Sequence, residues 1–129
     1  MTDRADRTDA VRFIAATPVL ASLDIGRTIA FYVERLGAVA VHAEQGVYGI
    51  VALGSIHLHF WACADRRIAE ATGCRVAVEG IDTLYARCTA VQIVHPNAPL
   101  HDTPWGTREF AVLDCDGNLI TFHQRRDEG

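Results

Sequence analysis

The sequence predicts an α+β fold made of two βαβββ modules, in which curved half-barrel sheets each carry one helix on their outer face. Three observations support this prediction. A helix with clear start and stop signals follows a short apolar strand, three strand-like runs come next, and the same order of elements begins again about 55 residues later. Repetition at such a period is typical of a duplicated supersecondary unit, so we expect two modules of similar topology.

The best-defined element is a helix that follows residue 24. Residues 17–23 are apolar and bounded by Pro18 and Asp24, which predicts a short strand before it. Asp24 can cap the helix with its carboxylate, and Gly37 can adopt the left-handed conformation that ends it. Between the two caps, apolar side chains recur at the spacing of one helical face: Ile25, Ile29, Tyr32 and Leu36. We therefore expect a helix from residue 25 to residue 36.

Three strands complete the first module. The strand-like runs cover residues 39–43, 47–53 and 56–63. The dipeptides Gln45-Gly46 and Gly54-Ser55 separate them, and both suit tight hairpin turns. The order β-α-β-β-β follows for the first half of the chain.

The second module repeats this order with weaker signals. Residues 74–78 predict a strand, and Asp82 opens a helix whose apolar side comprises Ile81, Leu84, Tyr85 and Cys88. The remaining elements are strands over residues 91–94, 108–113 and 119–123, a proline-bearing loop over residues 96–105 and a turn over residues 114–118. The polar residues 65–72 are the expected linker between the modules.

Length and composition fit one domain over residues 1–129, with modules at about 14–64 and 73–125 and a flexible segment at 1–12. Half of the residues are hydrophobic (50%) and 22% are charged, as in ordinary globular proteins. The apolar stretches fall short of the roughly 20 residues that span a bilayer. The first ten residues lack the apolar region of a secretory signal. We therefore expect a cytoplasmic protein with no membrane partner.

Charge and cysteine content exclude several other classes. The chain has 12 basic and 16 acidic side chains, giving a formal charge of −4, and no basic stripe, so nucleic acid is not expected as a partner. A cationic ligand would be mildly favoured. The four cysteines form no CxxC pair, which argues against a zinc ribbon or a thioredoxin-like redox motif, and we expect reduced, packed thiols.

Two segments carry a family resemblance. Residues 17–24 (TPVLASLD), followed by 29–32 (IAFY) and 35–37 (RLG), resemble the opening of many vicinal oxygen chelate proteins, the superfamily of glyoxalase I, bleomycin resistance proteins and extradiol dioxygenases. Residues 104–110 (PWGTREF), which run into 113–118 (LDCDGN), resemble the carboxy-terminal signature of the bleomycin resistance branch. The resemblance spans nearly all of residues 17–124 and implies the glyoxalase/bleomycin resistance fold. It departs from the branch at Cys115, where proline is common.

The same resemblance bears on metal binding. Metal-using members of the superfamily take His, Gln or Glu ligands from the first and last strands of each module. The corresponding positions here hold Thr17, Gly73 or Cys74, and Thr121. None of these residues supplies the imidazole or carboxylate that such a divalent ion requires. The resemblance therefore implies a metal-free binding protein without a cofactor.

Strand alternation predicts which side chains line a cavity. Successive side chains of a strand point to opposite faces, so His57, His59 and Trp61 share one face and the apolar residues between them pack against the helix. By the same rule Thr121 and His123 point inward from the last strand. A histidine-lined aromatic cavity follows. Packing alone is an equally open interpretation for the histidines and for Trp61, and a metal site formed by His57, His59 and His123 is a further alternative.

Two more residues stand out in the closing segment. Trp105 lies in a Pro-Trp-Gly loop at the mouth of the second module, where an aromatic side chain is better suited to stacking on a ligand than to filling a core. Arg108 and Glu109 are adjacent on a strand and must point to opposite faces. One of them should therefore point inward and have a partner.

The sequence thus favours a metal-independent protein of the bleomycin resistance type. It would sequester an aromatic or cationic ligand, such as a bleomycin-like glycopeptide, in grooves at a homodimer interface, using His57, His59, Trp61, Trp105, Thr121 and His123. The resemblance also implies an exchange of the first strand between protomers, with Pro18 at its start. Two alternatives remain: a metal-dependent lyase, isomerase or dioxygenase of the same fold, and a binding module for an unrelated metabolite.

Overall fold

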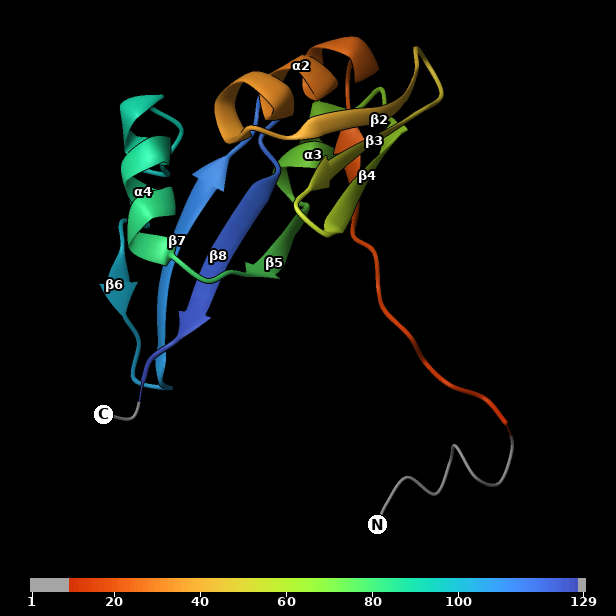
Figure 1. Cartoon of the computed structure of the whole chain (residues 1–129). Helices are drawn as coiled ribbons and strands as arrows, with labels where there is room; N and C mark the ends of the chain where they lie inside the picture. Colours follow the sequence, from red (N-terminus) through yellow and green to blue (C-terminus); the bar gives the residue numbers. More distant parts are fainter. Residues whose placement is uncertain (1–9, 128–129) are drawn as a thin grey trace.

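Two four-stranded mixed sheets form the framework of the protein in a computed structural model that describes residues 10–127 (Figure 1). The first sheet has the order β1-β4-β3-β2 and comprises β1 (Val19–Ser22), β4 (Ile56–Ala62), β3 (Tyr48–Leu53) and β2 (Val39–Glu44). The second has the order β5-β8-β7-β6 and comprises β5 (Gly73–Ala77), β8 (Leu119–Arg125), β7 (Thr107–Leu113) and β6 (His101–Asp102). In the first sheet β1 runs parallel to β4, and in the second β5 runs parallel to β8. The other neighbouring strands are antiparallel. This repeated arrangement confirms the α+β prediction.

The first helix, α2 (Ile25–Leu36), begins and ends at the predicted residues. The Asp24 carboxylate accepts a hydrogen bond from the backbone N–H of Arg27 at 3.1 Å. At the other end Gly37 has a φ of +73°, which places its N–H and the next one on the last carbonyls of the helix. Both caps were readable because each rests on a local side chain or backbone preference.

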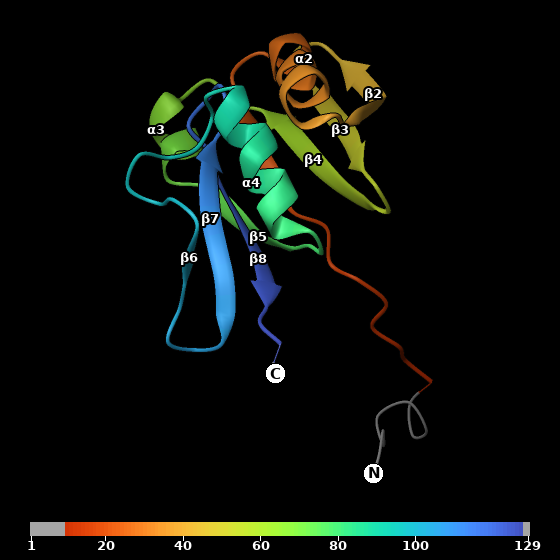
Figure 2. The same cartoon turned by 60° about the vertical axis from the view of Figure 1, so that its left-hand side comes forward.

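The helices bring the two sheets around a shared core. Helix α2 packs on the first sheet, α4 (Ile81–Ala90) packs on the second, and the two helices contact each other (Figures 1 and 2). One hydrophobic cluster draws buried side chains from both modules: Leu20, Ile25, Ile29, Tyr32, Val51, Leu58, Phe60, Val76, Ile81, Cys88, Phe110, Val112, Ile120 and Phe122. The helix-covered faces of both sheets therefore meet at this core, and the opposite faces point away from it. We call these opposite faces the open faces.

A buried polar joint fastens the second module to the first. The turn at residues 114–118 places Asp114 under the Tyr32 hydroxyl, which donates to it at 2.7 Å. The Thr28 hydroxyl donates to Asp116 at 3.0 Å, and the Asn118 amide donates to a backbone carbonyl of β1 at 2.8 Å. The two hydroxyl groups satisfy carboxylates that would otherwise be costly to bury, and the amide satisfies a backbone carbonyl. The modules are thus held in a fixed relation by directional bonds as well as by apolar packing.

The predicted linker at residues 65–72 contains a short helix, α3 (Arg66–Glu70), which was not predicted from the sequence. Asp65 caps it by accepting from the backbone N–H of Arg67 at 3.0 Å. Ala69 is fully buried and packs with Ala21 and Cys63. The polar composition that indicated a linker reflects the exposed side of this single turn of helix.

The predicted strand at residues 91–94 was wrong. Only an isolated bridge joins Val94 to Val112, because Gln92 has a φ of +61° and interrupts the extended backbone. The edge strand β6 instead lies inside the predicted loop at residues 96–105. Helix α4 forms as predicted, but Gly80 occupies its N-cap position and Asp82 lies in the first turn.

Two further expectations concern the chain as a whole. The flexible segment expected at residues 1–12 falls mostly on residues 1–9, which lie outside the described residues. Over residues 10–127, no helix has the length and apolar character needed to cross a membrane.

Candidate functional site

The first group of predicted site residues lies on β4. Leu58 and Phe60 are fully buried against α2, so His57, His59 and Trp61 occupy the open face of the first sheet. The two imidazole rings lie 6.5 Å apart between centroids and are tilted by 30°. Trp61 is 38% exposed. This arrangement agrees with the strand alternation and leaves all three side chains able to contact a ligand.

Tyr48 joins this group and was not predicted from the sequence. Its hydroxyl lies 2.9 Å from Nδ1 of His59, and the two rings meet edge to face. Strand β3 pairs Ile50 with His59, so the tyrosine two residues earlier lies on the same face. The position of Tyr48 beside His59 follows from the register of the hairpin, which cannot be inferred from the pattern of either strand alone.

The second group lies on the open face of the second sheet. Ile120 and Phe122 point into the core, which leaves Thr121 and His123 half-buried on the opposite face of β8. In the antiparallel register His123 faces Glu109 of β7. The polar residues of β8 therefore border the carboxylate of the neighbouring strand.

Trp105 lies in the turn that leads into β7. The turn at residues 103–107 is closed by a hydrogen bond of 2.8 Å from the N–H of Thr103 to the carbonyl of Thr107, and Gly106 has a φ of +94°. A side chain at that φ would be strained, which explains the glycine. The indole is 68% exposed, which makes Trp105 the most exposed tyrosine or tryptophan among residues 10–127. A side chain with this exposure contributes little to packing. The indole is available for stacking, as the loop position predicted.

Glu109 is the buried member of the Arg108-Glu109 pair. Its side chain is 7% exposed. Oε2 accepts hydrogen bonds from Nη2 of Arg75 at 2.7 Å, from the Thr107 hydroxyl at 2.7 Å and from Nε1 of Trp105 at 3.3 Å. The Arg75 guanidinium contributes most to lowering the pKa of Glu109 to about 2. Glu109 is therefore an ionised carboxylate on the open face, and it accepts a hydrogen bond from the exposed tryptophan.

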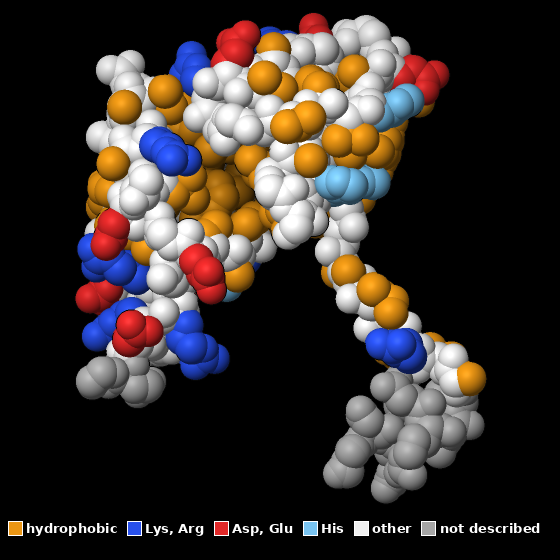
Figure 3. Space-filling model, viewed as in Figure 1, with side chains coloured by type: hydrophobic (Ala, Val, Ile, Leu, Met, Phe, Trp, Pro, Cys, Tyr) orange, Lys and Arg blue, Asp and Glu red, His pale blue; other side chains and the backbone are white. Residues whose placement is uncertain are grey.

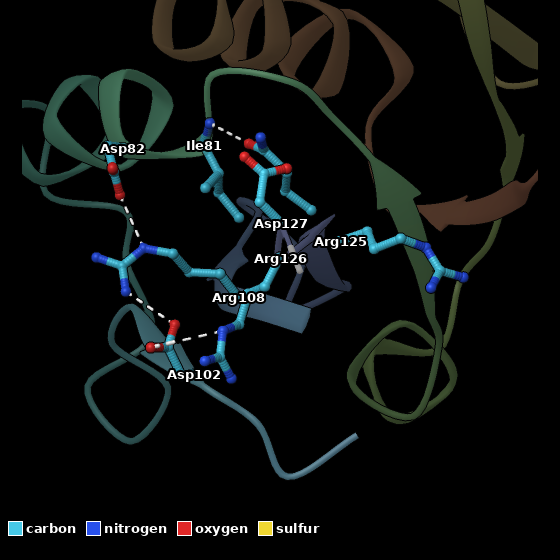
Figure 4. A pocket seen from close by; sticks show the side chains of 8 residues that line it. Ile81, Asp82, Asp102, Arg108, Arg125, Arg126 and Asp127 are labelled. Carbon is cyan, nitrogen blue, oxygen red and sulfur yellow. Dashed lines mark hydrogen bonds and ion pairs between the residues drawn. The ribbon is translucent and has the colours of Figure 1, made fainter. Parts of the chain in front are cut away.

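Arg108 points to the other side of β7, into a pocket of about 310 Å³ near the carboxy terminus (Figure 4). Its guanidinium donates to Asp82 and to Asp102, each at 2.9 Å, and Arg126 approaches Asp102 at 3.9 Å. These charges satisfy one another. The pocket therefore ties α4 and β6 to the end of the chain and presents no unbalanced charge that would favour a ligand.

Another pocket of about 380 Å³ connects residues of the two open faces. It is lined by His57 of the first module, Arg75 of the second, the hairpin at residues 55–56 and the arm at residues 15–18. The apolar hollow between α4 and the first sheet in Figure 3 is distinct, because it is lined by Leu36, Leu53 and Phe122 among others and by none of the six predicted residues. The described pocket that continues the candidate site is thus the one beside His57 and Arg75.

The metal alternative receives no support from the geometry. Over residues 10–127, no three His, Cys, Asp or Glu side chains gather closely enough to hold a metal ion. His57 and His59 lie on the first sheet and His123 on the second. What the open faces offer is aromatic surface, imidazole and hydroxyl groups, and one buried ion pair.

Comparisons with known proteins agree with this description. A bleomycin resistance protein of Geobacillus stearothermophilus is 35% identical over 129 aligned positions, which cover 87% of this chain and 97% of the relative. No family model matches the chain.

Two solved structures share the fold. The bleomycin-binding protein of the bleomycin producer Streptomyces verticillus, complexed with copper(II)-bleomycin, superposes with a TM-score of 0.77 at 28% identity, covering 92% of this chain and 99% of that one. A bleomycin-binding protein complexed with bleomycin superposes with a TM-score of 0.72 at 30% identity, covering 88% and 100% of the two chains.

Proposed function

Because the chain belongs to the bleomycin resistance protein family, we propose that it binds bleomycin or a closely similar glycopeptide and confers resistance by sequestration. The mechanism is binding alone, with no chemical change in the ligand and no metal of the protein's own. The main support for this proposal is the indole of Trp105, which is 68% exposed and donates its N–H to a buried carboxylate.

Stacking supplies the specific part of the recognition. A flat aromatic group of the ligand stacks on Trp105, and Trp61 offers a second aromatic surface on the other sheet. Each stack contributes about 0.5 to 1.5 kcal/mol beyond the burial of area. His57, His59, Thr121 and His123 provide hydrogen-bonding groups beside these surfaces. The net charge of −4 aids the capture of a cationic ligand.

A homodimer completes the site in this proposal. The open faces of the two sheets point away from their shared core, so Trp61 and Trp105 belong to separate surfaces of one chain. These surfaces carry exposed apolar side chains at Val19, Val39, Leu113 and Leu119, and surfaces of this kind favour association. A second copy can place one chain's first sheet against the other's second sheet and enclose two equivalent ligand grooves.

The arm before β1 supports the same assembly. Residues 10–18 extend away from the fold in Figure 1, and Phe13 and Ile14 are 94% and 78% exposed. The resemblance implied that the first strand is exchanged, but β1 pairs with β4 of its own chain as an edge strand, with Pro18 just before it. The segment that this proposal assigns to the exchange is therefore the arm and not β1. We propose that the arm lies across the neighbouring protomer. We also propose that the protein is cytoplasmic.

Calorimetry with bleomycin tests the proposal, both with the metal-free drug and with its copper(II) complex, beside metal analysis of the purified protein. We expect stoichiometric binding by a protein that contains no bound metal. Trp105→Ala should weaken the affinity about 30-fold, or about 2 kcal/mol, as loss of a central aromatic contact does.

Val33→Ala is a matched control, because Val33 is also exposed but lies on α2, away from both open faces. It should leave the affinity unchanged. If the wild-type protein gives no binding heat even at drug concentrations above the micromolar range, the proposal is wrong. It is also wrong if Trp105→Ala binds the drug as tightly as wild type.

A further inference from the structure

We propose that Glu109 is a positioning residue that fixes the Trp105 indole for stacking, and that Arg75 in turn fixes Glu109. The inference rests on the proposed function of Trp105 as the stacking surface. It adds the elements that hold the indole in place and the kind of ligand group that can use it.

An exposed tryptophan in a turn needs an anchor to serve as a rigid surface. With 68% of Trp105 exposed, few neighbouring atoms restrict its side-chain rotamers. An unrestrained indole would lose that freedom when a ligand bound, which reduces the affinity. The bond from Nε1 to Oε2 of Glu109, 3.3 Å long, restrains the ring at its edge before the ligand arrives.

Glu109 is itself held by several contacts. It lies in the middle of β7, which pairs with β8 on one side and β6 on the other, and its side chain is almost fully buried. Besides the indole, Oε2 accepts the Thr107 hydroxyl and Arg75, both at 2.7 Å. The bond from the indole is longer, 3.3 Å, but its acceptor is ionised, and a charged acceptor strengthens a hydrogen bond relative to a neutral one.

Arg75 fixes the carboxylate from the side. Nη2 and Nη1 approach the two oxygens of Glu109 at 2.7 and 3.3 Å, a two-point contact that sets the plane of the carboxylate. Lysine could supply only a single point charge here. Arg75 also lines the pocket beside His57, so the chain of contacts runs from the border of the first module to the exposed indole.

This arrangement determines what Trp105 can recognise. Its N–H is already donated to Glu109, and indole has no other polar hydrogen. The ligand group at this position must therefore meet the ring through its π face. A flat aromatic or heteroaromatic group fits this requirement, and a group that depends on receiving a hydrogen bond from the indole does not.

A double-mutant cycle tests the inference by calorimetry with bleomycin. Glu109→Gln should weaken binding about 10-fold in the wild-type background, because the charge that holds the indole is lost. In the Trp105→Ala background the same change should alter affinity by less than about twofold, because no indole remains to be positioned. An equal loss in both backgrounds would mean that Glu109 acts without Trp105, and the inference would be wrong.

A second measurement needs no ligand. In a Trp61→Phe protein, Trp105 is the remaining tryptophan, and its time-resolved fluorescence anisotropy reports motion of the indole. Glu109→Gln and Arg75→Lys should each enlarge the fast local decay, the lysine variant by less. Arg108→Gln removes an ion-paired charge from the opposite face of the same strand and should leave the decay unchanged.

The two measurements separate the two proposals. If the wild-type protein failed to bind bleomycin, the proposed function would fall while the anisotropy experiment would still decide whether Glu109 holds Trp105. An indole equally restrained in wild type and in Glu109→Gln would overturn the positioning role, even if the drug bound tightly.

Discussion

The two open faces each present a tryptophan, but they hold it by different means. Trp61 belongs to β4, and the register places it between Ala21 of β1 and Tyr48 of β3. Trp105 lies in a turn and is almost twice as exposed, 68% against 38%. Only Trp105 has its indole N–H bonded to a buried ionised carboxylate. The second face therefore has an ion pair beside its tryptophan, and the first has a hydrogen bond between Tyr48 and His59.

The difference shows how orientation is obtained on the two kinds of backbone. A strand with neighbours on both sides directs its side chains by the pleat, so Trp61 needs no polar anchor to point outward. A turn residue has no such constraint, and its orientation must come from a side-chain bond. The buried charge on the second sheet is explained by this need.

The buried joint at residues 114–118 holds the two faces in a fixed relation to each other. Asp116→Ala should lower the free energy of unfolding by about 2 to 4 kcal/mol, the largest effect we expect, because it removes the fully buried acceptor of Thr28 and Arg27. The half-exposed Arg27 can be rehydrated, which keeps the loss below that of a completely buried pair. Chemical denaturation measures it.

Asp82→Ala is the control for that experiment. Asp82 also pairs with an arginine, but its side chain is 74% exposed, so the cost should be below about 1 kcal/mol. Equal losses in the two variants would show that the joint contributes no more than a surface ion pair, and the two faces could then move independently.

The same contrast explains what could be predicted from the sequence. The caps of α2 and the placement of His57, His59 and Trp61 on the face of β4 opposite to the helix follow from preferences within about a dozen residues. The exposure of Trp105 also followed, from a Pro-Trp-Gly turn. The Arg75–Glu109 pair did not, because it joins positions of β5 and β7 that only the intervening strand β8 brings together. The sequence indicated only that Arg108 or Glu109 would point inward with a partner.

Two other errors have local causes that composition could not reveal. Val91 to Val94 has the apolar character of a strand, but the left-handed Gln92 ends helix α4 and prevents extension. The segment at residues 65–72 appears polar because one turn of helix buries a single alanine, Ala69. Neither a positive φ at glutamine nor a one-turn helix gives a periodic signal.

Acid should distinguish the face that carries the Arg75–Glu109 ion pair from the other face. The folded-state pKa of Glu109 is lowered from 4.5 to about 2, first of all by Arg75, so its ionised form stabilises the fold above pH 4.5. This contribution is lost as the pH falls from about 4.5 to about 2. The difference in unfolding free energy between wild type and Glu109→Gln should therefore shrink by about 2 kcal/mol over that interval.

Other carboxylates with lowered pKa values, such as Asp24 and Asp102, titrate in both proteins and cancel in the difference. Tyr48→Phe, on the first sheet, removes no carboxylate, so its stability difference from wild type should not change over the same interval. A pH-independent difference for Glu109→Gln would contradict the assignment of a stabilising charge to the second face.

The two tryptophans themselves give the smallest expected effect on stability and the most direct test of the contrast. Trp61→Ala should lower the free energy of unfolding by about 1 to 2 kcal/mol, because the part of the indole that is buried between β1 and β3 is lost. Trp105→Ala should change it by less than about 0.5 kcal/mol, since most of that ring is already in water and Glu109 keeps Arg75 and Thr107 as donors. For drug affinity the order should be reversed, with Trp105→Ala the more damaging. If both variants lost stability equally, Trp105 would be a packing residue, and its bond to Glu109 would serve the fold and not the ligand.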